Sequence, residues 1–151
     1  MSNGLEAQGV ILQRGDGATP TETFTKVAEI TSFNGPGGSA SIIDMTNLES
    51  EAKEKRVGLP DEGQISFECN LVPNDIGQSG LRDDRKSRKI RNFKFLLTDD
   101  PGGTGSSPTT LEFSAFVLNF SISGAVDGKI AASVTLEISG PVTWVAAVEG
   151  A

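Results

Sequence analysis

Two stretches of the chain alternate strictly between apolar and polar residues, and this period of two is typical of β-strands with one buried face. Residues 65–71 read Ile-Ser-Phe-Glu-Cys-Asn-Leu, and residues 130–138 place Ile, Ala, Val, Leu and Ile at the even positions. Because successive side chains on a strand point to opposite faces, one face must pack on a core and the other must be polar. We therefore expect a mainly β fold, an antiparallel β-sandwich or partial barrel.

The apolar phase changes within the stretch from 111 to 122. Leu111 and Phe113 occupy odd positions, whereas Phe116, Leu118, Phe120 and Ile122 occupy even positions. A slip of one residue carries every following side chain to the other face of a sheet. The change predicts either a β-bulge near Ala115 or a strand that leaves one packing environment and enters another.

Weaker strand patterns and turn signals fill most of the remaining chain. Strands are expected at 9–13, 24–33, 39–45 and 90–98, and a hairpin turn at Asp127-Gly128 is expected to return the chain onto a strand at 129–138. The sequence Asn-Gly-Pro-Gly-Gly at 34–38 predicts a tight connection between antiparallel neighbours.

Two segments do not alternate. Residues 47–60 are highly charged and long for a hairpin loop, which favours an interaction loop over a merely solvated one. Residues 74–88 predict a short helix that Asn74 or Asp75 caps. The basic end of this helix either complements the helix dipole or forms salt bridges to another subunit.

The length of 151 residues and the even composition predict a single domain over 1–151. We expect a flexible N-terminal arm at about 1–8, the long loop at about 47–60 and a C-terminal arm at about 144–151. The N-terminus lacks the basic and apolar regions of a secretory signal, and no apolar run is long enough to span a membrane. The apolar share of 36% predicts a modest core, so partner subunits could bury further surface.

The residues that most enzymes use for acid–base catalysis are scarce. The chain has no histidine, which excludes Ser-His-Asp and Cys-His sites and the commonest metal ligand. Cys69 lies in an alternating strand and is expected to be a small core residue. The carboxylate pairs Asp83-Asp84 and Asp99-Asp100 are expected in solvated turns. We therefore expect a structural protein, not an enzyme, with no cofactor and no metal.

The order of elements resembles that of the major tail tube protein of lambda-like, long non-contractile-tailed phages. The resemblance covers roughly residues 20–145, and the stretch 65–81 carries it most closely: an alternating strand runs into Leu-Val-Pro-Asn-Asp and then a short helix. A basic-aromatic strand, Arg-Asn-Phe-Lys-Phe at 91–95, and Thr-Asp-Asp at 98–100 follow. The resemblance implies a virion protein of the tail, made in the host bacterial cytoplasm. Its hexameric rings stack into a tube that conducts genomic DNA.

The resemblance also implies partners and roles for surfaces. The expected partners are other copies of the chain, the tape measure protein, the tail tip or baseplate, and the tail terminator. Double-stranded DNA in transit is expected to bind weakly and non-specifically, because the net charge is −7. The residues expected to line the channel are Ser66, Glu68, Asn70, Ser133, Thr135 and Glu137. The inter-ring loop is expected to use Glu49, Glu51, Lys53, Glu54, Lys55 and Arg56, and the subunit interface Arg82, Asp83, Asp84, Arg85 and Arg88.

Other readings stay open at this point. The chain could form the tube of a tailed bacteriocin, a gene transfer particle or a secretion system, because one fold serves several particles. A small-ligand-binding β-sandwich belongs to a different class of function. A single tryptophan, Trp144, and the absence of tyrosine argue against a sugar site in such a sandwich.

Overall fold

The computed structural model describes residues 5, 8–18 and 21–150, so most of the expected N-terminal arm lies outside the described residues. The elements in chain order are β1 (Ile11–Gly15), β2 (Phe24–Lys26), β3 (Ile30–Asn34), β4 (Ser39–Asp44), β5 (Lys55–Asp61), β6 (Gln64–Asn70), α1 (Ile76–Ser87), β7 (Arg91–Leu96), β8 (Thr110–Ser123), β9 (Ala131–Ile138) and β10 (Thr143–Val145). The fold is mainly antiparallel β with one short helix, as the alternating patterns predict.

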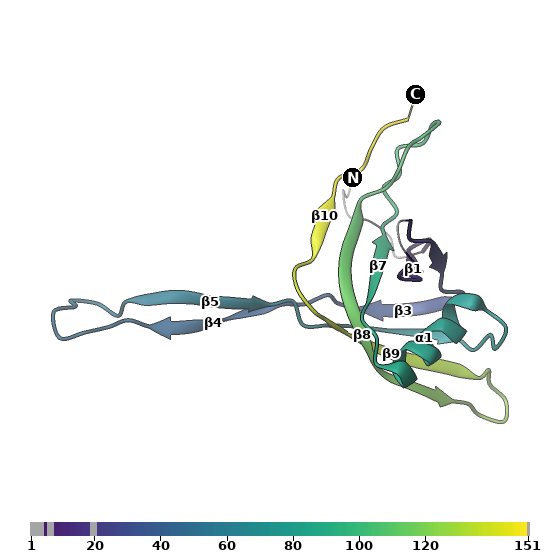
Figure 1. Cartoon of the computed structure of the whole chain (residues 1–151), viewed down its shortest axis with the longest axis horizontal. Coiled ribbons are helices and arrows are strands. Elements are labelled where there is room, and N and C mark those ends of the chain that lie inside the picture. Colours follow the sequence, from purple (N-terminus) through teal and green to yellow (C-terminus); the bar gives the residue numbers. More distant parts are fainter. Residues whose placement is uncertain (1–4, 6–7, 19–20, 151) are drawn as a thin grey trace.

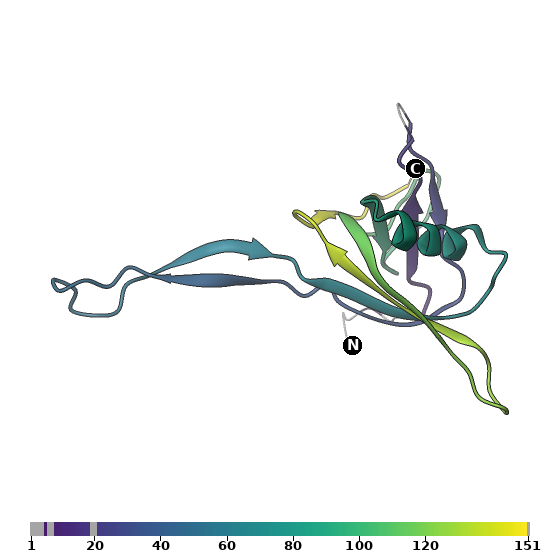
Figure 2. The same cartoon turned by 60° about the horizontal axis from the view of Figure 1, so that its bottom comes forward.

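One curved sheet forms the body of the molecule (Figure 1). Its strand order is β2-β1-β7-β8-β9-β6-β3, and β10 pairs with β8 outside this path. The first half of β8 lies beside β7 and β10, and its second half pairs with β9. Helix α1 packs against β8 and against β1 and β2, and Figure 2 shows it lying across the curve of the sheet.

The core lies inside this curve and follows the alternation of the strands. Ile65, Phe67 and Cys69 of β6 are buried, as are Ala132, Val134, Leu136 and Ile138 of β9. Leu12, Phe93, Phe113 and Leu81 of α1 belong to the same cluster. Cys69 is 0% exposed, which confirms that this residue is a small core side chain, and burial raises the pKa of its thiol to about 11.

The β-bulge of β8 lies at Leu118, so the prediction of a bulge near Ala115 is wrong in position. Val117 pairs with Leu136, and Asn119 pairs with the next residue of β9, Thr135, which leaves Leu118 as the extra residue. Ala115 and Val117 therefore keep the odd buried phase, and the phase changes only afterwards.

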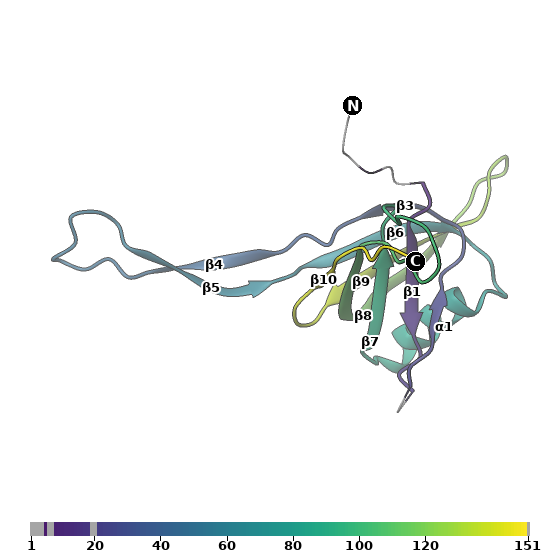
Figure 3. The same cartoon turned by 90° about the horizontal axis from the view of Figure 1, so that it is seen from above.

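A long two-stranded arm, made of β4, β5 and the turn between them, projects from one side of the body (Figures 1 and 3). Residues 34–38 are not the tight turn that the sequence predicted, because β3 pairs with β6 while β4 pairs with β5. They join two strands that belong to different sheets. The predicted loop over 47–60 is also partly wrong, because its last residues belong to β5.

The segment over 144–151 is tied to the sheet at its beginning. Trp144 pairs with Leu111 as part of β10, and the backbones of Val148 and Ser107 exchange hydrogen bonds of 2.9 and 3.0 Å. Among the described residues, no helix is long and apolar enough to cross a membrane.

Candidate interaction surfaces

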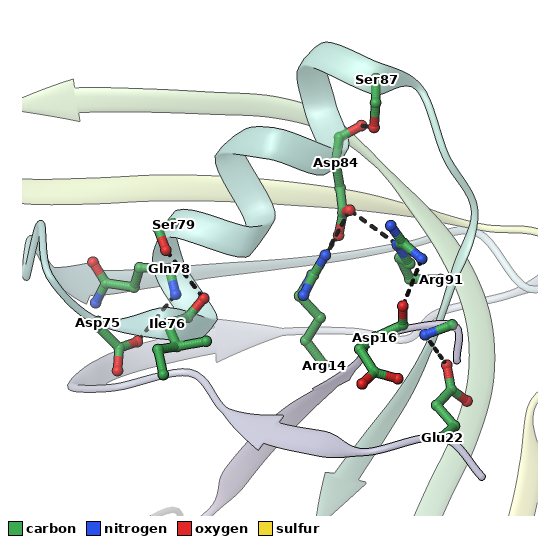
Figure 4. Close-up of polar contacts among 11 residues, drawn as sticks. Arg14, Asp16, Glu22, Asp75, Ile76, Gln78, Ser79, Asp84, Ser87 and Arg91 are labelled. Atoms are coloured by element: carbon green, nitrogen blue, oxygen red, sulfur yellow. Dashed lines mark hydrogen bonds and ion pairs between the residues drawn. The ribbon is translucent and has the colours of Figure 1, made fainter. Parts of the chain in front are cut away.

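Helix α1 is fixed to the sheet through Asp84, which is 1% exposed (Figure 4). Arg14 of β1 donates hydrogen bonds of 2.5 and 2.7 Å to the two carboxylate oxygens of Asp84. Arg91 of β7 donates a third, of 3.0 Å. The hydrogen bonds to the Asp84 carboxylate raise the pKa of Arg14, and charge-assisted hydrogen bonds of this kind are stronger than neutral ones.

This geometry corrects two predictions about Asp84. Asp84 lies on a helix and not in a solvated turn. Its carboxylate pairs with two arginines of the same subunit, so it cannot form salt bridges at a subunit interface. The physical reason is the position of Asp84 on the helix face that meets β1 and β7, opposite two arginines.

The first turn of α1 is fixed by two polar side chains. Asp75 caps the helix by accepting from the backbone N–H of Gln78 at 3.0 Å, and it also accepts from Ala28 at 3.1 Å. This confirms one of the two predicted caps. The buried amide of Gln78 accepts from the backbone of Val72 and donates to the carbonyls of Ala28 and Asn70, each at 2.9 Å.

The opposite face of α1 is exposed and basic. Arg82, Asp83, Arg85 and Arg88 are all exposed, so another subunit could contact them, and their place in an interface stays a prediction. Arg88 ends the helix with a left-handed backbone, φ 58°, and its N–H donates to the carbonyl of Asp84. The basic side chains at this end of α1 therefore lie near the negative end of the helix dipole.

The residues predicted to line a channel share one polar face of the sheet. Ser66 pairs with Thr135 and Glu68 pairs with Ser133 across the β6–β9 ladder. All six predicted residues alternate with buried core residues on these strands, so they face away from the core. The six are Ser66, Glu68, Asn70, Ser133, Thr135 and Glu137. The shared face is confirmed, and the channel stays a prediction.

The same face extends over two more strands that the sequence analysis did not assign to it. Ser32 of β3 pairs with Glu68, and Asn119 and Ser121 of β8 pair with Thr135 and Ser133. The alternation of Asn119 and Ser121 with Phe120 and Ile122 was the signal that could have assigned these two polar residues to the face. Residues 30–34, 64–70, 116–123 and 131–138 contain two carboxylates, Glu68 and Glu137, and no lysine or arginine.

The arm exposes apolar side chains over its whole length. Ile42 pairs with Val57, and Leu59 lies further along β5, where the register shifts between the Ile42–Val57 and Ala40–Pro60 pairs. All three are exposed, as are Ile43, Met45 and Leu48. A hairpin that stands alone is marginally stable in water, and an exposed apolar face marks an interaction site. The arm therefore has the character of a segment that another surface covers.

The six residues predicted for the inter-ring loop all lie at the far end of this arm. Glu49, Glu51, Lys53 and Glu54 belong to the turn that joins the strands, and Lys55 and Arg56 begin β5. The turn is held by its own hydrogen bonds, including Met45 to Glu54 at 2.8 Å and Ser50 to Asn47 at 3.1 Å. Contacts to another ring remain a prediction.

Comparison with known proteins gives one family and several similar folds. The model of the family described as phage tail tube, lambda-like, matches residues 6–148. A search of curated proteins finds no match.

Among solved structures, the tail of an empty gene transfer agent particle, refined with C6 symmetry, has 14% identity and a TM-score of 0.71, and the match covers 95% of this chain and 100% of that one. The SPP1 tail tube has 14% identity and a TM-score of 0.70, with 95% and 80% covered. The sheath–tube complex of an extracellular contractile injection system has 17% identity and a TM-score of 0.70, with 97% and 94% covered. At these identities the likeness concerns the fold.

Proposed function

The chain belongs to the lambda-like phage tail tube family, and we propose that its hexameric rings stack into a tube that conducts genomic DNA. The protein is a structural component of the tail of a virion. The observation that carries the proposal is the projecting β4–β5 arm with its exposed apolar face, which no other part of the described chain covers. Such an arm is expected in a subunit whose exposed apolar side chains are buried by neighbouring subunits after assembly.

The arm is proposed to make the contact between rings. Its turn carries the charged residues Glu49, Glu51, Lys53 and Glu54, which can form charge pairs on another ring, and its strands offer apolar area. The single domain proposed for 1–151 would then have a body that builds the ring and an arm that connects it. The N-terminal arm at 1–8 and the last residues from 144 are proposed as further contacts.

The polar face of β3, β6, β8 and β9 is proposed to line the channel. Glu68 and Glu137 are the only charges on these strand segments, so six copies of each would form two rings of negative charge. Glu137 pairs with Gln64 and Glu68 pairs with Ser133, so the two carboxylates lie four residues apart in register, about 13 Å along the strands. A wall of this kind repels phosphates and offers DNA no fixed cation.

The exposed residues of α1, with Arg82 and Asp83 at their centre, are proposed to belong to a subunit interface. Proposed partners outside the ring are the tape measure protein, the tail tip or baseplate and the tail terminator. DNA would pass without tight binding, and no membrane insertion, cofactor or enzymatic activity is proposed. Synthesis would take place in the host bacterial cytoplasm.

A tube of a gene transfer particle, a tailed bacteriocin or a secretion system is the alternative. The similar folds include a gene transfer agent tail and an injection-system tube, which supports this alternative at the level of the fold. The family match favours a phage.

Electron microscopy of the concentrated protein, alone and together with other tail proteins, tests the proposal. Rings or open-ended tubes are expected. Monodisperse monomers at every concentration, with and without the other tail proteins, would contradict it and favour a small-ligand-binding β-sandwich.

A further inference from the structure

An apolar groove lies between the end of α1 and the middle of β8. It has a volume of 590 Å³ and is lined by Arg85, Arg88, Ile90, Phe116, Val117 and Leu118. Two backbone features open it. Arg88 has a left-handed backbone and ends the helix before Ile90, whose side chain is 56% exposed. The β8 bulge places Leu118 at the surface, where it is 46% exposed. The floor is therefore aliphatic and aromatic, with two guanidinium groups at its rim.

The surface around this groove is strongly basic on a chain that is acidic overall. Arg82, Arg85, Lys86, Arg88 and Lys89 are five of the 13 lysines and arginines, while the net charge is −7. All five are exposed, and within the described residues none of them forms an ion pair. A complementary ligand must bring an apolar group to the floor and carboxylates to the rim.

The turn at the end of the arm has this chemistry. Leu48 is 106% exposed and stands beside Glu49 and Glu51. Residues 45–54 carry three glutamates and one lysine. The turn at 124–129 also exposes an apolar residue, Val126 at 103%, but it carries one aspartate and one lysine and so has no net charge. Charge therefore favours the turn of the arm.

The contact cannot form within one subunit. The arm extends away from the body on the side opposite α1, so its turn lies far from α1, whose last residues border the groove (Figure 1). Because the turn of the arm and the groove are different surfaces, each copy can place its own arm on a second copy and receive the arm of a third. Such a heterologous contact continues from copy to copy.

We propose that Leu48 of one copy docks on the floor of the α1–β8 groove of a second copy, while Glu49 and Glu51 pair with Arg85 and Arg88 at its rim. This assignment rests on the proposed tube and names the surface that receives the arm.

Disulfide trapping tests the contact directly. Chains with Leu48→Cys and chains with Leu118→Cys are mixed, assembled and oxidised, and a covalent dimer that requires both chains is expected. Cys69 is buried and adds no background. Val126→Cys replaces Leu48→Cys in the matched control, and a dimer with Val126→Cys but none with Leu48→Cys would overturn the assignment.

Charge exchange tests it a second time, with assembly as the readout. Arg85→Glu with Arg88→Glu should abolish assembly at concentrations where the wild type assembles, and adding Glu49→Arg with Glu51→Arg should restore it. Lys129→Glu is the control outside the groove and should assemble normally. If the wild type builds tubes but the Leu48→Cys and Leu118→Cys chains give no crosslink, or charge exchange gives no loss and rescue of assembly, the groove contact is overturned and the tube is not. A wild type that never assembles would overturn the tube itself.

Discussion

Asp84 of α1 and Arg14 of β1, seventy residues apart in the chain, form a two-pronged ion pair with distances of 2.5 and 2.7 Å. Arg91 shares the same carboxylate, and the Asp84 side chain is 2% exposed. Asp84→Ala would leave two largely buried guanidinium groups without their anion. We expect a loss of about 3 kcal/mol in the free energy of unfolding, since removing one member of a buried pair is strongly destabilising.

Urea denaturation of the unassembled protein measures this loss, and Asp83→Ala is the matched control. Asp83 is exposed on the same helix turn, so its removal should change the free energy of unfolding by less than about 0.5 kcal/mol. Equal effects of the two substitutions would show that the ion pair does not hold the helix.

The contrast between Asp83 and Asp84 explains what the sequence could not provide. Two adjacent aspartates on a helix differ in direction by about 100°, and only the partner from β1 decides which one is buried. That partner lies far away in sequence, so local patterns gave the helix and its cap at Asp75 but not the burial of Asp84.

The strands show the same division between local and distant information. Burial of alternate residues on β6 and β9 was predictable because both strands have one face on the core. Of the two strands of the arm, β4 was predicted at 39–45, but β5 was predicted to be part of a loop. Nearly all of β5 is exposed, so no alternation of buried and exposed residues marks it as a strand. The bulge at Leu118 depends on register with β9, which a single strand does not reveal.

Gln78 offers a second test of how the helix is held. Its amide forms three hydrogen bonds of 2.9 Å to backbone groups of the segments on either side. Gln78→Leu keeps the volume but leaves a backbone N–H and two carbonyls unpaired, which should cost about 3 kcal/mol. Thermal unfolding measures it. Ser79→Ala removes a more exposed hydroxyl of the same turn and should be nearly neutral, and an equally neutral Gln78→Leu would contradict the role of the amide.

Cys69 predicts a dependence on alkaline pH. Burial raises the thiol pKa from 9.0 to about 11 in the folded protein. The unfolded chain therefore releases this proton at lower pH, and the contribution to stability is complete below pH 9.0 and is lost as the pH rises toward about 11. Thiol reagents at pH 8 should react only after unfolding. Cys69→Ala should remove the loss of unfolding free energy that this thiol causes between pH 9.0 and about 11. Rapid reaction of the folded protein with a thiol reagent would contradict the burial of Cys69.

Shortening the arm separates folding from assembly. Asp44 and Lys55 are the last paired residues of β4 and β5, so an Asn-Gly turn can join them in place of residues 45–54. The body makes no use of this segment, and the monomer should unfold as the wild type does. Electron microscopy should show no tubes. Tubes of normal length from this variant would mean that the turn of the arm does not connect rings.

The polar face of the sheet predicts how charge on the wall affects DNA. Glu68→Lys and Glu137→Lys would place rings of cations where the proposed channel carries only carboxylates, and DNA phosphates bind such cations non-specifically. Both residues lie away from the core, so tubes should form with stability within about 0.5 kcal/mol of the wild type. DNA ejection should slow, and added salt should restore it by screening the contact.

Glu68→Gln, which removes the carboxylate without adding a cation, is the control, and particles with this variant should eject DNA at nearly the normal rate. A density map of the tube that places Glu68 and Glu137 on its outer surface would disprove the channel assignment without any measurement of ejection.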